Sequence, residues 1–471
     1  MRQLGTWQLT TGAAVLGLAL AAGAVTAAGP WDSGQRTAER TWAAESDRGP
    51  DGTRRGGVDE GPAPAPSAPA VLSALGTAPD DAVGRGEVGG GATDTLAREL
   101  DPLLRAPGLG KQRAASVVDV ATGRELYGAE ATRAMTPAST VKIATAAAAL
   151  SALGPHHRVP TTVVASKDAR TLTLVGGGDA TLDRARLRTL ADRTASDLRS
   201  RKVTAVRLGY DTSRYRGPDL HPIGVNGNLA KVTPLMVDQG RVDPRSTGSA
   251  ERVADPAGEA AGAFAALLGE RGVRIEGAPA HGRPPAGAKP LSTVLSAPLS
   301  AVVERMLTTS DNDIAESLAR HTAVALREEA SFAGAGRAVQ KQLTVLKVPL
   351  TGAHFADGSG LDRAGRVTAR LLTSLLARAA EPTHPGLRPV LTGLPVAGFT
   401  GTLESRYREA ASPATGVVRA KTGTLTGVNA LSGTAVTPTG RVLAFAFLAS
   451  DTASPEEAQR ALDALATSLT T

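Results

Sequence analysis

Apolar residues recur along most of the chain in short runs, and the spacing within each run predicts either a helix or a strand. The run at 143–150 is rich in alanine and leucine and is followed by Gly154, which is typical of a helix that stops at a glycine. The apolar runs at 115–120 and 442–448 are shorter and are bounded by turn residues, which is typical of strands. By the same criteria, further helices are predicted at 96–104 (with a break at Pro102), 181–199, 257–268, 299–307, 314–326, 333–343, 367–379 and 455–468, and further strands at 125–127, 161–165, 171–175, 203–209, 273–276, 416–421 and 428–435.

The order of these elements predicts more than one packed unit. Residues 161–292 begin with two paired strands and then alternate helix and strand, which predicts an inserted αβ domain. The flanking segments, 96–160 and 293–471, are predicted to be two parts of a second domain that carries the candidate chemistry. A chain of 471 residues is long enough for both units to bury a core.

The first 95 residues predict no folded domain. Residues 9–28 form an uncharged stretch of 20 residues between two tryptophans, so residues 1–28 are expected to be a cleaved signal peptide or a retained membrane anchor. Residues 29–95 are rich in glycine, proline and alanine and have no periodic apolar face, so a disordered linker is expected. In either case the remainder of the chain is expected to be extracytoplasmic, secreted or held at the outer face of the cell membrane.

The composition narrows the classes of function. Hydrophobic residues make up 42% of the chain but aromatic residues only 3%, so the core is expected to depend on alanine, valine and leucine. The formal net charge is +7, from 52 basic and 45 acidic residues scattered along the chain, and this pattern does not predict nucleic-acid binding. Cysteine is absent, which excludes disulfides, thiol chemistry and cysteine-based metal sites.

The strongest chemical signal is Ser139-x-x-Lys142 at the start of the predicted helix. Residues three apart share one face of a helix, so the hydroxyl and the amine are expected to meet. A lysine that burial keeps partly neutral can take the proton of a serine and make it a nucleophile. The alternative is an ordinary helix N-terminus, with Ser139 as its cap and Lys142 in solvent.

Two later segments complete a constellation. Ser310 and Asn312 lie in a polar break between two predicted helices, where a hydroxyl could relay a proton and an amide could hold a peptide substrate. Lys421 and Thr422 end a predicted strand and could grip a free carboxylate, while Gly423 would leave room for substrate backbone. The structural alternatives are that Ser310 is a helix N-cap and that 421–423 is a strand running into a turn.

Taken in order, these motifs resemble the D-alanyl-D-alanine carboxypeptidases/endopeptidases of the class C low-molecular-mass penicillin-binding protein family. The resemblance extends from about Leu96 to the C-terminus and includes the stretches 174–179, 357–361, 401–403 and 421–428. It implies an α+β fold of the DD-peptidase/β-lactamase-like serine transpeptidase type. In that fold an antiparallel sheet flanked by helices adjoins an all-helical lobe, here with an inserted αβ domain.

The resemblance also implies an activity and its residues. The expected function is a serine-type D-alanyl-D-alanine carboxypeptidase, or also a DD-endopeptidase, that acts on peptidoglycan stem peptides ending in D-Ala-D-Ala and is inhibited by β-lactams. No cofactor and no metal is implied. The implied roles are nucleophile for Ser139, general base for Lys142, proton relay for Ser310, amide holder for Asn312, carboxylate binders for Lys421 and Thr422, and oxyanion-hole N–H groups for Ser139 and Thr424.

Three alternatives stay open from the sequence. A β-lactamase would share the motifs but would also need a positioned water, and no glutamate can be assigned to that task. A catalytically idle penicillin-binding or wall-binding domain would not require a nucleophile beside a base. The stretch Asp357-Gly358-Ser359-Gly360 hints at a Ser-His-Asp hydrolase, but it is interpreted as a structural turn. The oligomeric state is unknown.

Overall fold

The computed structural model describes residues 91–408 and 412–471. The expected signal or anchor segment, and the linker up to residue 90, lie outside the described residues. Among the helices that the structure does describe, none is both long and apolar enough to cross a membrane.

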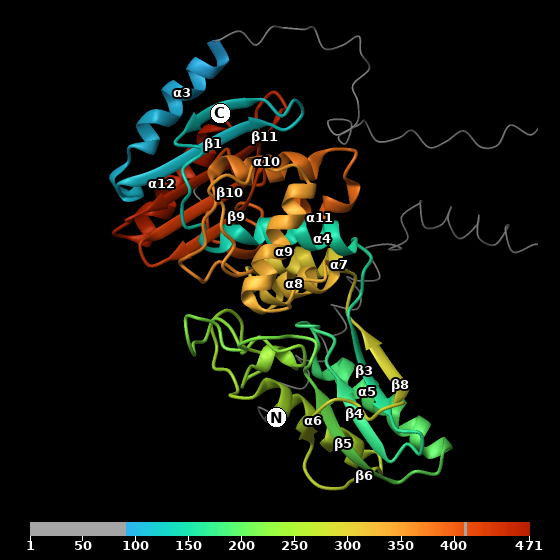
Figure 1. The fold of residues 1–471 in the computed structure, drawn as a ribbon. Coiled ribbons are helices and arrows are strands. Elements are labelled where there is room, and N and C mark those ends of the chain that lie inside the picture. The colour runs from blue at the N-terminus through green and yellow to red at the C-terminus, as the bar shows by residue number, and fades with distance from the viewer. Residues whose placement is uncertain (1–90, 409–411) are drawn as a thin grey trace, which may run out of the picture. The chain divides into compact units, whose positions relative to one another are not determined.

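The first described element is helix α3, Gly91–Leu104, which packs against the C-terminal helix α12, Pro455–Ser468, and against strand β2, Glu125–Ala129 (Figure 1). Leu100 is fully buried in this contact. The two ends of the described chain therefore lie side by side and share one core.

Helix α3 corrects two expectations. Residues 91–95 belong to this helix and not to a linker that runs to residue 95. The sequence also suggested a break at Pro102, but the helix continues to Leu104. A proline this close to the helix end interrupts little of the hydrogen-bond ladder, and the burial of Leu100 and Leu104 offsets that loss.

A five-stranded antiparallel sheet, in the order β2-β1-β11-β10-β9, forms the centre of the first unit. Because side chains alternate along a strand, its two faces are distinct. On β11, Ala444 and Ala446 face helix α10, whereas Phe445 and Phe447 face helices α12 and α3. The remaining strands are β1 Gln112–Asp119, β9 Val418–Leu425, β10 Val428–Val436 and β11 Val442–Ser450.

An all-helical lobe packs against the alanine-rich face of this sheet. Its central element is α4, Lys142–Leu153, whose residues are buried from Lys142 through Leu150. Small alanine side chains let α8 and α9 approach α4 closely from two sides. The other helices of the lobe are α7 Leu299–Thr309, α8 Asn312–Ala325, α9 Phe332–Val345, α10 Ala369–Ala380 and α11 Pro389–Thr392.

The inserted segment forms a second sheet in the order β6-β5-β4-β3-β8, and β7 also pairs with β5. The strands β4 and β5 are parallel, since helix α5 connects them, and helix α6 packs beside α5. Leucines and Phe264 fill the space between helices and sheet. The bounds are β3 Pro160–Ala165, β4 Thr171–Val175, α5 Arg184–Ser200, β5 Ala205–Asp211, α6 Pro256–Glu270, β6 Arg274–Ile275, β7 Ala280–His281 and β8 Lys289–Leu295.

The architecture confirms the α+β fold class expected from the sequence. One helix boundary differs from the expected one because a capping side chain sets it. Helix α5, expected from Thr181, begins at Arg184 because the carboxylate of Asp183 accepts a hydrogen bond from the N–H of Arg186.

Gly433 of β10 is a position where the fold tolerates no side chain. An added Cβ would lie 1.9 Å from the carbonyl oxygen of Arg419 on β9. Gly433→Ala is therefore expected to lower the free energy of unfolding by about 1–3 kcal/mol. The matched control is Gly262→Ala in α6, where an added Cβ meets no atom within 4 Å and should raise stability by about 0.5–1 kcal/mol. Urea unfolding measures both, and equal stabilities of the two variants would contradict this packing.

Candidate active site

Ser139 and Lys142 lie on one continuous turn where the sheet meets the helical lobe. Ser139 belongs to a short 3₁₀ helix, Ala138–Val141, and Lys142 is the first residue of α4. Their side chains meet, with 2.9 Å between Lys142 Nζ and Ser139 Oγ. Ser139 is partly exposed, whereas Lys142 is fully buried, so the alternative of a solvent-exposed lysine is wrong.

The Lys142 amine has three hydrogen-bond acceptors from three different elements. Besides Ser139, it contacts Asn312 Oδ1 at 2.7 Å and the carbonyl oxygen of Ser359 at 2.7 Å. Burial lowers the pKa of Lys142 to about 8, against the opposing effect of nearby carboxylates, of which Asp357 is the largest. Roughly a tenth of the molecules then hold a neutral amine at pH 7.

Ser310 and Asn312 occupy the break between α7 and α8. Ser310 ends α7 in the left-handed conformation, with φ of 59°. The N-cap of α8 is Asp311, whose carboxylate accepts the N–H of Ile314. The alternative that Ser310 caps a helix N-terminus is therefore wrong. The neighbouring Asn312 points its oxygen at Lys142 and donates its amide to the carbonyl of Asn228, at 2.9 Å.

Lys421 and Thr422 lie on β9, the edge strand of the five-stranded sheet. Lys421 is fully buried, and its Nζ lies 2.8 Å from Ser310 Oγ and 2.8 Å from the carbonyl oxygen of Thr422. Burial, followed by the charge of Lys142, lowers the pKa of Lys421 well below its usual value. The hydroxyl of Thr422 donates to Thr402 Oγ1 at 2.9 Å.

The remainder of the 421–424 motif lies in the same strand, which continues to Leu425 and does not turn at Gly423. We expected Gly423 to leave room for substrate backbone. In the structure its missing Cβ faces protein, since an added Cβ would lie 2.8 Å from the carbonyl oxygen of Pro137. Thr424 is exposed on β9, opposite Asn429 of β10.

The structure thus joins the predicted residues into two hydrogen-bonded groups. One contains Ser139, Lys142 and Asn312, and the other contains Ser310, Lys421 and Thr422. The sequence did not assign the partners Ser359, Asn228 and Thr402. For Ser359 and Thr402 a signal existed, because both lie in stretches that carry the family resemblance. Ser359 and Asn228 take part through their backbone carbonyls, which the residue type does not reveal.

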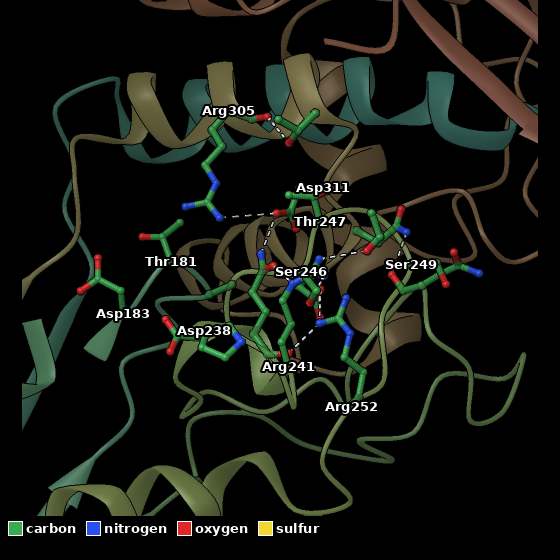
Figure 2. Close-up of a pocket in the computed structure, with 18 of the residues that line it drawn as sticks. Thr181, Asp183, Asp238, Arg241, Ser246, Thr247, Ser249, Arg252, Arg305 and Asp311 are labelled. Carbon is green, nitrogen blue, oxygen red and sulfur yellow. Dashed lines mark hydrogen bonds and ion pairs between the residues drawn. The ribbon is translucent and has the colours of Figure 1, made fainter. Parts of the chain in front are cut away.

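A cavity of about 490 Å³ borders this site (Figure 2). Ser310 and Asn312 line one side of it, and a loop of the inserted segment that contains Arg241 and Arg252 lines the other. Arg252 forms an ion pair at 3.0 Å with Asp313, and both side chains are buried. The cavity therefore gives a bulky substrate room between the inserted segment and the reactive residues.

The stretch Asp357-Gly358-Ser359-Gly360 contacts Lys142 through the Ser359 carbonyl and does not form a Ser-His-Asp triad. Ser359 is fully buried, and its hydroxyl donates directly to Asp357 at 3.1 Å. The nearby His221 contacts the same carboxylate, so the acid lies between serine and histidine. A triad needs the histidine in the middle, because the histidine must take the proton of the serine.

The chain resembles known proteins over almost all of its described length. A sequence profile described as the D-Ala-D-Ala carboxypeptidase 3 (S13) family matches residues 96–251 and 245–469. A carboxypeptidase of Mycobacterium tuberculosis is 38% identical over 440 residues, which cover 89% of this chain and 91% of that protein. Carboxypeptidase DacB of Mycolicibacterium smegmatis is 38% identical over 391 residues, which cover 79% of this chain and 83% of that protein.

Among solved structures, penicillin binding protein 4 (dacB) from Haemophilus influenzae superposes with a TM-score of 0.66 at 21% identity, over 80% of this chain and 98% of that one. At this identity the superposition establishes a shared fold. Together with the family match over residues 96–469, it confirms the resemblance drawn from the motifs. The chain belongs to the D-Ala-D-Ala carboxypeptidase 3 (S13) family of serine peptidases.

Proposed function

We propose that this protein is a serine-type D-alanyl-D-alanine carboxypeptidase in which Ser139 is the nucleophile and Lys142 the general base. The observation that carries the assignment of residues is the contact of 2.9 Å between Ser139 Oγ and a fully buried amine whose pKa lies near 8. An idle wall-binding domain would not need a lysine held close to neutral beside a hydroxyl.

The three acceptors around Lys142 decide which proton the amine loses. An ammonium has three N–H donors, and here they match three acceptors. The carbonyl of Ser359 and the amide oxygen of Asn312 can only accept, so they keep an N–H each when the amine is neutral. The lone pair is then directed at Ser139, whose hydroxyl can turn from acceptor to donor.

The reaction follows from this geometry. The neutral amine takes the proton of Ser139 as Oγ attacks the carbonyl of the penultimate D-alanine, and the peptide oxygen becomes an oxyanion. The C–N bond then breaks, and the proton that Lys142 took passes through Ser310 to the nitrogen of the leaving D-alanine, so that Lys142 is neutral again and the ester on Ser139 remains. Water then attacks this ester while Lys142 takes its proton, and Lys142 returns that proton to Ser139 Oγ as the shortened peptide leaves, which restores both residues.

Lys421 and Thr422 are assigned to the terminal carboxylate of the substrate. Burial lowers the pKa of Lys421, and the negative charge of a carboxylate bound beside it would raise that pKa and stabilise the protonated form. The hydroxyl of Thr422, which contacts Thr402 here, would supply a second hydrogen bond. Asn312 would hold the peptide, and the N–H groups of Ser139 and Thr424 would bind the oxyanion.

The substrate we propose is a peptidoglycan stem peptide that ends in D-Ala-D-Ala, and β-lactams would acylate the same serine. The cavity beside Ser310 and Asn312 supports this proposal, because it leaves space for substrate next to these residues. The uncharged stretch at 9–28 supports an extracytoplasmic location, with that segment as signal peptide or anchor.

Ser139→Ala should abolish both labelling by penicillin and release of D-alanine. Intact mass spectrometry of the wild type after incubation with penicillin should show a stable adduct, and peptide mapping should place it on Ser139. The control is Ser359→Ala, which removes a buried hydroxyl close to Lys142 but keeps the backbone carbonyl that Lys142 contacts, and it should retain the adduct. An adduct that persists in Ser139→Ala would move the nucleophile elsewhere.

The acylation rate should rise with pH and level off above about 8, because only the neutral form of Lys142 can accept the serine proton and its pKa lies near that value. Lys142→Arg should acylate at least about a hundredfold more slowly at every pH, since a guanidinium stays protonated. Stopped-flow labelling between about pH 6 and pH 9 measures both. A profile of the wild type that is flat over this range would contradict the role of Lys142.

Thr422→Val should narrow the preference for peptides with a free C-terminal carboxylate over their amides. The valine keeps the volume but removes one charge-assisted hydrogen bond, which should cost about ten- to a hundredfold in kcat/KM for the free acid. The amide substrate serves as the internal control and should change little. Equal cleavage of acid and amide by the wild type would refute the carboxylate site.

Purified muropeptides decide how the activity divides between carboxypeptidase and endopeptidase. Release of D-alanine from uncrosslinked peptides indicates a carboxypeptidase. Conversion of cross-linked dimers to monomers indicates an endopeptidase. Ser139→Ala should remove both activities, because one acyl-enzyme serves both reactions.

A further inference from the structure

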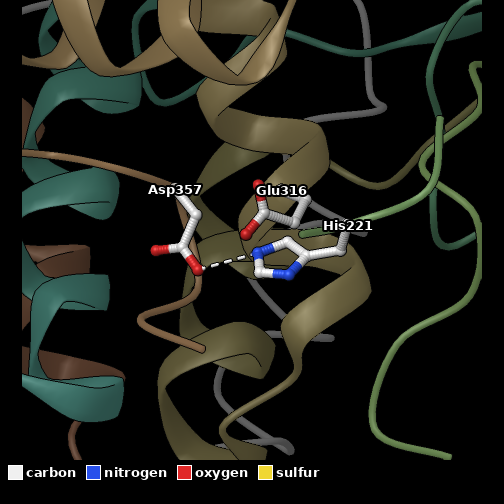
Figure 3. A group of neighbouring side chains, drawn as sticks. All are labelled: His221, Glu316 and Asp357. Atoms are coloured by element: carbon white, nitrogen blue, oxygen red, sulfur yellow. Dashed lines mark hydrogen bonds and ion pairs between the residues drawn. The ribbon is translucent and has the colours of Figure 1, made fainter. Parts of the chain in front are cut away.

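A buried cluster of three ionisable side chains lies near Lys142. Figure 3 shows how the three side chains face one another. His221 comes from the inserted segment, Glu316 from α8, and Asp357 from the loop 357–362 that follows α9. The candidate ligand atoms of all three lie within 4.8 Å of one another. Each side chain is almost completely buried, with exposed fractions of 2%, 1% and 4%.

The hydrogen bonds of this cluster fix the roles of its atoms. The N–H of Ile223 lies 3.2 Å from His221 Nδ1, so Nδ1 accepts. His221 Nε2 therefore carries a hydrogen and donates it to Asp357 Oδ2, at 3.0 Å. The histidine thus ties the inserted segment to a loop of the catalytic unit.

The two carboxylates hold the backbone of the loop 357–362. Asp357 accepts the N–H groups of Gly360 and Asp362, each at 2.8 Å. Glu316 accepts those of Gly358, at 3.1 Å, and of Ser359, at 2.9 Å. Four backbone donors of one short loop are therefore satisfied by two buried acids.

This loop touches Lys142 and the residue before Ser139. Its Ser359 carbonyl accepts from Lys142 Nζ at 2.7 Å. Its Gly360, with φ of 82°, lies so close to the residue before Ser139 that an added Cβ would be 1.9 Å from the carbonyl oxygen of Ala138. Thr145 of α4 also donates to the Gly358 carbonyl, at 2.7 Å. A displacement of the loop would therefore move an acceptor of the general base.

We propose that His221 is a positioning residue for the reaction, which acts from the inserted segment through Asp357 and the Ser359 carbonyl to hold the Lys142 amine against Ser139. The inference rests on the proposed function, because it gives Lys142 the part of general base. It assigns the inserted segment a contribution to the acylation step itself, besides any contact with substrate.

The ionisable groups of the cluster shift one another's pKa values. Burial would lower the pKa of His221, but its bond to Asp357 and the charges of Glu316 and Asp362 outweigh burial and raise it. Burial, together with Asp357, raises the pKa of Glu316 to about 7. Arg320 of α8 also lies near Glu316.

Asp357 and Glu316, with Asp311 and Asp313, favour the protonated form of Lys142 against burial. Because His221 holds Asp357, a displacement of the loop 357–362 would also change the charges around the general base.

A bound cation is the competing explanation of the same cluster. The carboxylate oxygens already accept the loop N–H groups, and Nε2 of His221 carries a hydrogen that a metal would have to replace. Both ring nitrogens and both acids are thus used without an ion.

The test compares three substitutions at His221. In His221→Gln the side-chain amide can still reach Asp357 and donate, whereas Leu cannot donate and Asn is one methylene too short. The second-order rate constant for acylation by a fluorescent penicillin should fall about ten- to a hundredfold in His221→Leu, since a buried bond to a charged group is lost. His221→Gln should stay within about threefold of the wild type, because the bond to Asp357 is kept.

His321→Leu is the matched control for lost stability. His321 is as deeply buried as His221 and also borders the inserted segment, where its Nε2 lies 3.0 Å from the carbonyl oxygen of Gly178. Its hydrogen bond to that carbonyl, unlike the bond of His221, does not go to the loop 357–362. Thermal unfolding should show that His221→Leu and His321→Leu are both destabilised, while only His221→Leu acylates slowly per folded molecule. Equal acylation by these two variants would overturn the proposal.

Two further outcomes are decisive. If His221→Leu does not fold, His221→Gln and His221→Asn are compared instead. Equal acylation rates for these two variants would overturn the proposal. Titration of the wild type with Zn²⁺ alone should detect no stoichiometric binding that His221→Gln removes, and such binding would assign the cluster to a cation instead. If the wild type itself forms no adduct on Ser139, the proposed function fails, which is a result distinct from all of these.

Discussion

The structure depends above all on the burial of the Lys142 amine among three acceptors. A lysine side chain without water needs every N–H matched, because an unpaired buried donor costs about 1–3 kcal/mol. Here the partners come from three elements: the turn that holds Ser139, helix α8 with Asn312, and the loop that presents the Ser359 carbonyl. The same burial that lowers the pKa of the amine thus obliges these three elements to meet at one point.

The alanine-rich composition makes this arrangement sterically possible. Helix α4 is buried along its first nine residues, and most of these are alanines, so α8 and α9 lie close to its backbone. Close packing brings Asn312 within hydrogen-bond distance of a lysine that begins the neighbouring helix. The bulky aromatic pair Phe445 and Phe447 lies on the opposite face of the sheet, away from the reactive residues.

The inserted segment is coupled to the reactive residues at several points. Asn228 accepts the amide of Asn312, the N–H of Ala230 donates to Asp313 at 2.9 Å, and Gln239 donates to Asp311 at 2.6 Å. These contacts converge on the break between α7 and α8, where the backbone of Ser310 adopts a positive φ. A polar break between two apolar helices needs such partners, because its side chains would otherwise be buried without hydrogen bonds.

The sequence by itself determined the class of the fold, the approximate position of most helices and strands, and the residue types of the site. Ser139 and Lys142 could be paired from their spacing, since residues three apart share a helix face whatever the tertiary structure. Only the tertiary structure decided that Lys421 meets Ser310, that Gly423 faces the backbone of Pro137, and that a backbone carbonyl of the 357–360 stretch serves Lys142. The reason is physical: such contacts join segments more than a hundred positions apart, and a carbonyl oxygen is present in every residue, so neither local periodicity nor residue identity could reveal them.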